Sequence, residues 1–66
     1  MTIKDLRVSL NKSQNEFSVY FNIPVGTLQH WEQGVSKPPK YVYYLIKRVI
    51  ELESELNEVY YGKKNE

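Results

Sequence analysis

SQNEFSVYFNIPVGTLQHWEQG, residues 13–34, carries two helix starts and two helix ends in close succession. The first start is Ser13 followed by Glu16, the S-x-x-E pattern of a capping box. In this motif the serine hydroxyl and the glutamate carboxylate each accept a hydrogen bond from the first backbone N–H groups of a helix. The pattern predicts a helix over 14–21.

The rest of the stretch predicts a tight turn and a second short helix. Asn22 tolerates the left-handed backbone that closes a helix, and Pro24 fits the N-terminal edge of the next one because its missing N–H costs nothing there. Gly34 ends that helix, which we expect over 24–33. Two short helices joined by three or four residues have the dimensions of a helix-turn-helix. Their apolar residues at helical spacing should face a core: Phe17, Phe21, Leu28 and Trp31.

Two further helices flank this pair. Thr2 and Asp5 form a variant capping box and predict a helix over 3–10. After a loop that ends in two prolines, no helix breaker occurs before Gly62, which predicts a long helix over 39–61. Its apolar residues alternate at spacings of three and four, a heptad pattern: Val42, Leu45, Val49, Leu52, Leu56 and Val59. The fold class is therefore all-α, with four helices and an extended C-terminal one.

Composition excludes several classes of protein. The chain has no cysteine and a single histidine, His30, so it offers no disulfide framework, no closed set of metal ligands and no nucleophile–base pair. We therefore expect no enzymatic activity, metal or cofactor. The N-terminus lacks the apolar segment of a signal peptide, and no apolar run is long enough to span a membrane, so we expect a cytoplasmic protein. The net charge is only +1, but residues 1–40 are mildly basic and 41–66 acidic.

SLNKSQNEFSVYFNIPVGTLQHWEQGVSKPP, residues 9–39, resembles the helix-turn-helix of the XRE family, the phage Cro- and repressor-like DNA-binding domains. The resemblance covers about residues 3–50. The residues in register with the family pattern are Ser13, Gln14, Phe17, Ile23, Thr27, Leu28, Trp31, Glu32, Gly34 and Pro38. The departures are Ser18 for a small alanine, Asn22 for the turn glycine and Pro24 for the serine or threonine N-cap. The chain also extends the fourth helix where the family usually closes its core with a short fifth.

The resemblance implies a lambda-repressor-like fold in which the helix over 24–33 enters the major groove of double-stranded DNA. Its exposed residues would reach base edges: Val25, Gly26, Thr27, Gln29 and His30. Glutamine can pair with adenine, threonine or valine can touch a thymine methyl, and histidine can donate to guanine. Ser13 and Gln14, at the start of their helix, would hold one phosphate backbone. Gln33, Lys37 and Lys40 would hold the other.

Simpler roles compete with these assignments. Trp31 is favoured as a core residue and Glu32 as a structural one, with Arg7 as a possible ion-pair partner. His30 can also be a plain exposed residue. The two lysines after the helix can likewise belong to a solvated face.

We divide the chain into a DNA-binding domain, residues 1–50, and a C-terminal extension, 51–66, that serves dimerisation. The residues expected in the dimer interface are Val49, Leu52, Leu56 and Val59. A parallel pairing is favoured because it would bring Arg48 of one helix to Glu53 of the other. Dimerisation through another surface, or a toxin or other protein partner on this stripe, stays open.

Together these patterns predict a sequence-specific, double-stranded DNA-binding transcriptional regulator. It would act as a dimeric repressor on a palindromic operator of a phage, a mobile element or a bacterial operon. Two alternatives remain on the same fold. One is the antitoxin of a toxin–antitoxin pair, and the other is a protein-interaction module that does not bind DNA.

Overall fold

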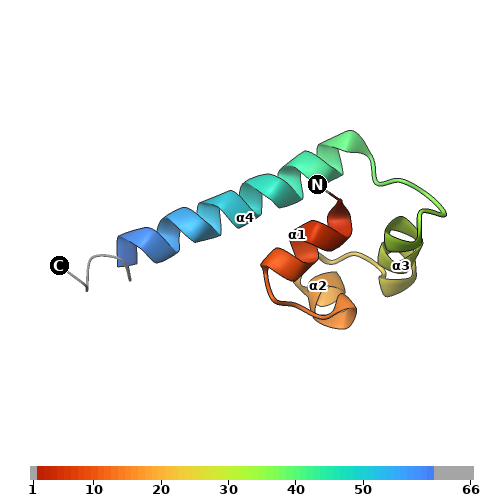
Figure 1. The fold of residues 1–66 in the computed structure, drawn as a ribbon, viewed down its shortest axis with the longest axis horizontal. Coiled ribbons are helices and arrows are strands. Elements are labelled where there is room, and N and C mark those ends of the chain that lie inside the picture. Colours follow the sequence, from red (N-terminus) through yellow and green to blue (C-terminus); the bar gives the residue numbers. More distant parts are fainter. Residues whose placement is uncertain (1, 61–66) are drawn as a thin grey trace.

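The computed structural model describes the backbone of residues 2–60 and the side chains of residues 2–57. Over this range the chain forms four helices and no strand: α1 (Ile3–Ser9), α2 (Gln14–Phe21), α3 (Val25–Gln33) and α4 (Lys40–Tyr60). Figure 1 shows α1, α2 and α3 gathered beside the N-terminal half of α4, while the C-terminal half of α4 projects beyond them. The predicted all-α fold with an extended last helix is confirmed.

Both capping boxes form, and they fix where α1 and α2 begin. The Thr2 hydroxyl accepts from the Asp5 N–H at 3.1 Å and the Asp5 carboxylate accepts from the Thr2 N–H at 2.9 Å. Ser13 and Glu16 make the same exchange at 3.1 and 2.8 Å. The backbone hydrogen bonds lower the pKa of both carboxyls, so each box is strongest when its acid is ionised.

The helix bounds differ from the predictions by one residue at three ends. Leu10 is the C-cap of α1, so that helix stops at Ser9. Pro24 is the N-cap of α3 and lies outside the helix, because its ψ of 133° is not helical. α4 begins at Lys40, one residue later than expected. The predicted end at 61 lies outside the described residues.

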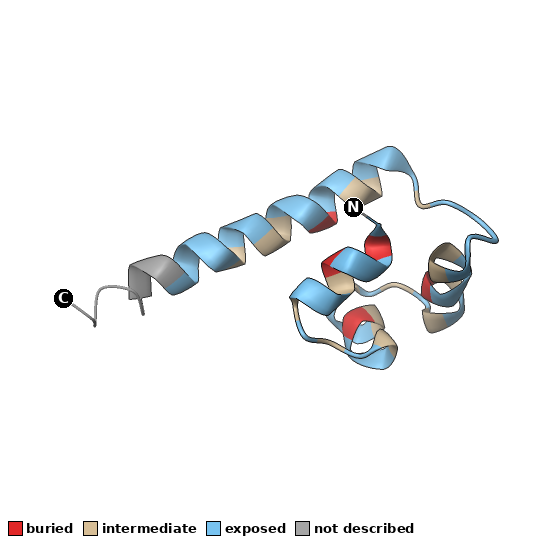
Figure 2. Ribbon diagram, viewed as in Figure 1, coloured by how far each residue is buried: buried red, intermediate tan, exposed pale blue. Residues whose placement is uncertain are grey.

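One small core holds all four helices together. Its buried residues come from every helix: Ile3, Leu6, Phe17, Leu28 and Ile46. Figure 2 shows them on the inner faces of α1–α3 and on the adjoining face of α4. Phe17 and Leu28 are fully buried, and the rings of Phe17 and Phe21 lie 4.7 Å apart between centroids. The predicted inward orientation of Phe17 and Leu28 is confirmed, with Phe21 and Trp31 packed at the edge of the cluster.

The heptad stripe of α4 coincides only in part with the face that enters the core. Ile46 is buried, with Val42 and Ile50 half-buried beside it, because positions four apart lie on the same side of a helix. Leu45 is 61% exposed. Of the first heptad residues, Val42 therefore packs against the core, whereas Leu45 is replaced there by its neighbour Ile46.

The core predicts a large difference between two neighbouring residues of α2. Phe17→Ala removes a fully buried ring and should lower the free energy of unfolding by about 3–5 kcal/mol. Val19→Ala, at a position that is 81% exposed, should change it by less than about 0.5 kcal/mol. Urea titration followed by circular dichroism measures both, and equal effects would contradict the assigned core.

Candidate nucleic-acid interface

The turn between α2 and α3 sets the angle at which α3 is presented. Asn22 is the C-cap of α2 with left-handed dihedrals, φ 56° and ψ 45°, as the sequence predicted. The next N–H, that of Ile23, donates to the Ser18 carbonyl at 2.8 Å, and the Ile23 side chain packs against the core. This closure by a left-handed residue and an apolar anchor leaves the turn little freedom.

α3 is held by its inner face and exposes its outer one. Leu28 is fully buried and Trp31 packs at the edge of the core. Pro24 provides no side-chain cap, as predicted. Gly34 ends the helix with φ 79°, in the region that glycine enters without steric cost. α3 is thus a short helix whose inner face packs on the core, which follows a tight turn and which ends at Gly34.

The candidate base-reading residues occupy the outer side of α3. Gly26, Gln29 and His30 are exposed, whereas Val25 and Thr27 are half-buried near the start of the helix. The added Cβ of any other residue at Gly26 would meet nothing within 4 Å. Neither crowding nor a positive φ therefore requires glycine at this position.

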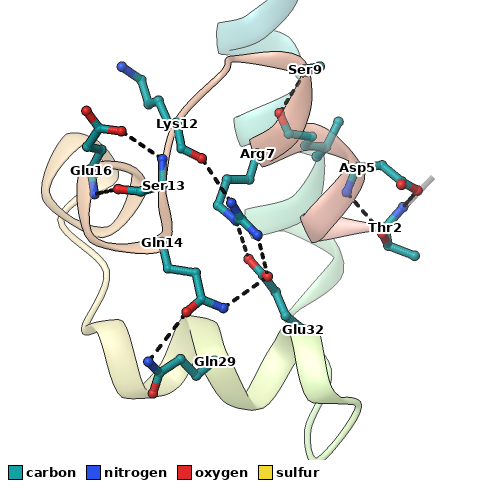
Figure 3. Close-up of polar contacts among 11 residues, drawn as sticks. Thr2, Asp5, Arg7, Ser9, Lys12, Ser13, Gln14, Glu16, Gln29 and Glu32 are labelled. Atoms are coloured by element: carbon teal, nitrogen blue, oxygen red, sulfur yellow. Dashed lines mark hydrogen bonds and ion pairs between the residues drawn. The ribbon is translucent and has the colours of Figure 1, made fainter.

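A chain of polar side chains connects α1 to the outer side of α3 (Figure 3). Arg7 pairs with Glu32 through two hydrogen bonds, Nε to Oε2 at 2.7 Å and Nη2 to Oε1 at 2.9 Å, and also donates to the Lys12 carbonyl. Gln14 donates to Glu32 Oε1 at 3.1 Å and accepts from Gln29 Nε2 at 3.5 Å. We call Arg7, Glu32, Gln14 and Gln29 the polar relay.

The Arg7–Glu32 pair, proposed from the sequence as a possibility, is confirmed and nearly covered. Only 14% of the Arg7 side chain and 6% of the Glu32 side chain are exposed. Hydrogen bonds from Arg7 hold the pKa of Glu32 below its ordinary value of 4.5, against the opposing effect of burial, and Gln14 adds to the lowering. Glu32 is therefore ionised whenever the domain is folded near neutral pH.

The relay gives Gln14 a role that sequence reasoning missed. Its amide nitrogen donates to Glu32 and its amide oxygen accepts from Gln29. The phosphate contact expected of Gln14 stays a prediction. Because both contacts cross between helices, no local pattern of the sequence could have indicated them. Gln14 connects the buried ion pair to a residue on the exposed face of α3.

The candidate phosphate-binding residues lie on either side of α3. The Ser13 hydroxyl accepts from the Glu16 N–H and still has its own hydrogen to donate. All three residues expected on the other strand are exposed: Gln33 at the end of α3, Lys37 in the loop that follows and Lys40 at the start of α4. The predicted residues thus fall into one group on α3 and two groups that flank it in the sequence.

The described residues contain neither a metal-binding cluster nor a membrane-spanning helix. Over residues 2–57, whose side chains the structure describes, no three side chains of the histidine, cysteine, aspartate and glutamate kinds are grouped so as to hold a metal ion. No helix in the same range is both long and apolar enough to cross a membrane.

Comparison with known proteins supports the geometry. The helix-turn-helix family model HTH_3 matches residues 3–57, which is most of the chain. No curated protein and no solved structure matches.

The relay predicts a pH-dependent contribution to stability. Glu32→Gln leaves Arg7 without a charged partner and should lower the free energy of unfolding at pH 7 by about 2 kcal/mol. The folded-state pKa of Glu32 is depressed, so this contribution is complete above the ordinary value of 4.5 and is lost as the pH falls through the folded value. The difference between variant and wild type should therefore shrink as the pH falls below 4.5.

Urea unfolding at pH 7 and at steps below pH 4.5 measures this contribution. The matched control is Glu51→Gln, which alters an exposed pair with Arg48. It should change the free energy of unfolding very little, both at pH 7 and below pH 4.5. If the difference in free energy of unfolding between Glu32→Gln and the wild type stays constant with pH, the assigned ion pair is contradicted.

Proposed function

The chain belongs to the HTH_3 family of XRE-type helix-turn-helix proteins, whose members are DNA-binding regulators, and from this premise we propose that it is a sequence-specific transcriptional repressor that binds double-stranded DNA as a homodimer. The proposal rests on how α3 is held in the domain. Leu28 anchors it in the core while Gln29 and His30 are exposed on its outer side. A rigid helix with polar side chains on its outer face can read base edges in the major groove.

Base reading would rest on Gln29, with His30, Thr27 and Val25 beside it. Gln29 can make two hydrogen bonds to adenine, and His30 can donate to guanine. The 3.5 Å contact to Gln14 holds the Gln29 amide partly in place before DNA binds. Restricting a side chain in advance reduces the entropy lost on binding. The polar relay thus supports recognition by a residue that is otherwise free on an exposed helix.

Phosphate contacts would fix the register of α3 in the groove. The hydroxyl of Ser13 and the backbone N–H groups at the start of α2 suit one strand, since a helix N-terminus attracts anions. Gln33, Lys37 and Lys40 suit the other. The two lysines are exposed and would release counterions from DNA on binding.

Homodimerisation would use the exposed stripe of α4. Val49 is half-buried, and Leu52 and Leu56 are 43% and 53% exposed. The side chain of Val59, the fourth expected interface residue, lies outside the described residues. On this proposal residues 1–50 bind DNA and 51–66 dimerise. A two-fold axis would place the α3 helices about 34 Å apart on a palindromic site.

A protein partner is the second candidate function. The exposed apolar stripe of α4 favours it, as does the start of α3, where Val25 and Gly26 offer no polar side chain. An antitoxin would use the stripe for its toxin and α3 for DNA, whereas an interaction module would use the stripe alone. Duplex binding separates the module from the regulator.

DNA binding is tested by fluorescence anisotropy with labelled duplexes of random sequence at low salt. The wild type should bind, and its affinity should fall steeply with salt. Lys37→Ala should weaken binding to every duplex and reduce the slope of log K against log salt by about 1. Gln29→Ala should leave that slope unchanged, because it alters base reading and no phosphate contact. Failure of the wild type to bind at low salt would contradict the regulator proposal.

Dimerisation is tested by sedimentation equilibrium. Leu52→Glu combined with Leu56→Glu should give monomers, because two charges per chain would have to be buried in the interface. Ser54→Glu and Glu51→Gln, on the outer side of α4, should remain dimeric. Dimers that survive both leucine substitutions would remove the stripe from the interface.

A further inference from the structure

We infer that two copies pair along α4 in antiparallel orientation, so that Leu52 and Leu56 of each copy fill a groove at the other end of the second copy's α4. The inference rests on the proposed homodimer and specifies its geometry. Two observations favour it: the two halves of the α4 stripe have complementary shapes, and the antiparallel orientation pairs Arg48 with Glu55, a carboxylate that is exposed.

The N-terminal half of the stripe borders a groove. An apolar hollow of about 260 Å³ lies between α4 and the α2–α3 turn. It is lined by Phe21, Ile23, Val42, Leu45, Ile46 and Val49. The side chain of Leu45 is 61% exposed at its edge. This half of α4 can receive an apolar side chain from outside.

The C-terminal half of the stripe protrudes. Leu52 and Leu56 are 43% and 53% exposed and belong to the C-terminal half of α4. Figure 1 shows this half extending beyond α1–α3. Among the residues whose side chains the structure describes, Ile50 is the last of α4 that packs against the core. An isolated helical segment of this length is marginal in water, so a partner helix would stabilise it.

Orientation decides whether these two halves meet. In a parallel pair Leu45 of one copy faces Leu45 of the other, so the two grooves face each other. Leu56 likewise faces Leu56, so the protruding leucines meet each other and no groove is filled. In an antiparallel pair Leu45 lies opposite Leu56 of the second copy, and Val49 lies opposite Leu52 of the second copy. Each groove then receives the leucines that the other copy exposes, which gives the closer packing that helix interfaces require.

The charges beside the stripe agree with the antiparallel orientation. Arg48 and Glu55 are seven residues apart and share the flank of the stripe that faces away from the core. Reversing one helix brings this flank of both copies together, so Arg48 of each copy meets Glu55 of the other. Arg48 is available, because its pair with Glu51 is 3.4 Å long and both side chains are at least half exposed.

The parallel pairing expected from the sequence uses a residue that is already engaged. It would bring Arg48 to Glu53 of the second copy. The Glu53 carboxylate accepts a hydrogen bond from the Tyr20 hydroxyl of α2 and is half-buried on the core side of α4. In a parallel pair Arg48 would have to reach this half-buried carboxylate, whereas in the antiparallel pair it meets Glu55, which is exposed.

Cysteine crosslinking tests the orientation, because the chain has no cysteine of its own. Leu45→Cys and Leu56→Cys are made as separate full-length chains, one of them labelled with ¹⁵N so that mass spectrometry identifies mixed dimers. On mild oxidation, a mixture of the two chains should form the mixed disulfide rapidly, and each chain alone should form none at that rate. Ser54→Cys, on the outer side of α4, serves as the control that should not crosslink.

Charge exchange gives a second readout that needs no oxidation. Arg48→Glu and Glu55→Arg should each weaken the dimer about tenfold, because attraction becomes repulsion at two symmetric contacts. The double variant Arg48→Glu with Glu55→Arg should recover wild-type dimerisation. Recovery with Arg48→Glu and Glu53→Arg instead would overturn the inference.

The crosslinking outcomes separate this inference from the proposed function. Rapid crosslinks in each chain alone would show a parallel dimer and overturn the antiparallel one, while leaving DNA binding and dimerisation intact. Monomers on sedimentation, with no crosslinks, would overturn the inference and the homodimer together. Titration of the same samples with duplex DNA tests the DNA-binding proposal independently of either result.

Discussion

The buried pair of Arg7 and Glu32 is the constraint on which the presentation of α3 depends. It joins the first helix to the last turn of the third, with bonds of 2.7 and 2.9 Å and little exposed surface. Such a pair favours the one arrangement of α1 and α3 in which both partners meet, because either of them left alone would be a covered charge without compensation. Gln14 extends the pair to α2 and on to Gln29. The orientation of α3 is therefore fixed by the polar contacts of the relay as well as by the packing of Leu28 and Trp31.

The small core explains why so much of the chain is left for binding. Among the described residues, five buried side chains from four helices hold the domain together, which leaves the outer side of α3 and one side of α4 outside the core. On our proposals the first surface reads DNA and the second binds another copy. The two surfaces lie on different helices, so a substitution in one can be tested with little effect on the other.

Local features of the sequence predicted the local structure well. The two capping boxes, the left-handed residues Asn22 and Gly34, and the uncapped start at Pro24 all follow from side-chain chemistry within four residues. Contacts between helices were harder to predict. Periodicity showed an apolar stripe on α4 but could not say that Ile46, one residue beyond the stripe, enters the core. The role of Gln14 depends on three helices meeting at one point, and the bond from Tyr20 to Glu53 depends on where α4 crosses α2. Such contacts are set by packing and leave no spacing pattern.

The central claim is that α3 reads DNA sequence on a two-fold symmetric complex. Selection of bound duplexes from a random pool, followed by sequencing, tests it most directly. We predict an enriched palindrome whose half-sites lie about one helical turn apart, since a dimer of this motif repeats its contacts at about 34 Å. An enriched single half-site without symmetry would contradict the dimer, and a pool with no enriched sequence would contradict base reading by α3.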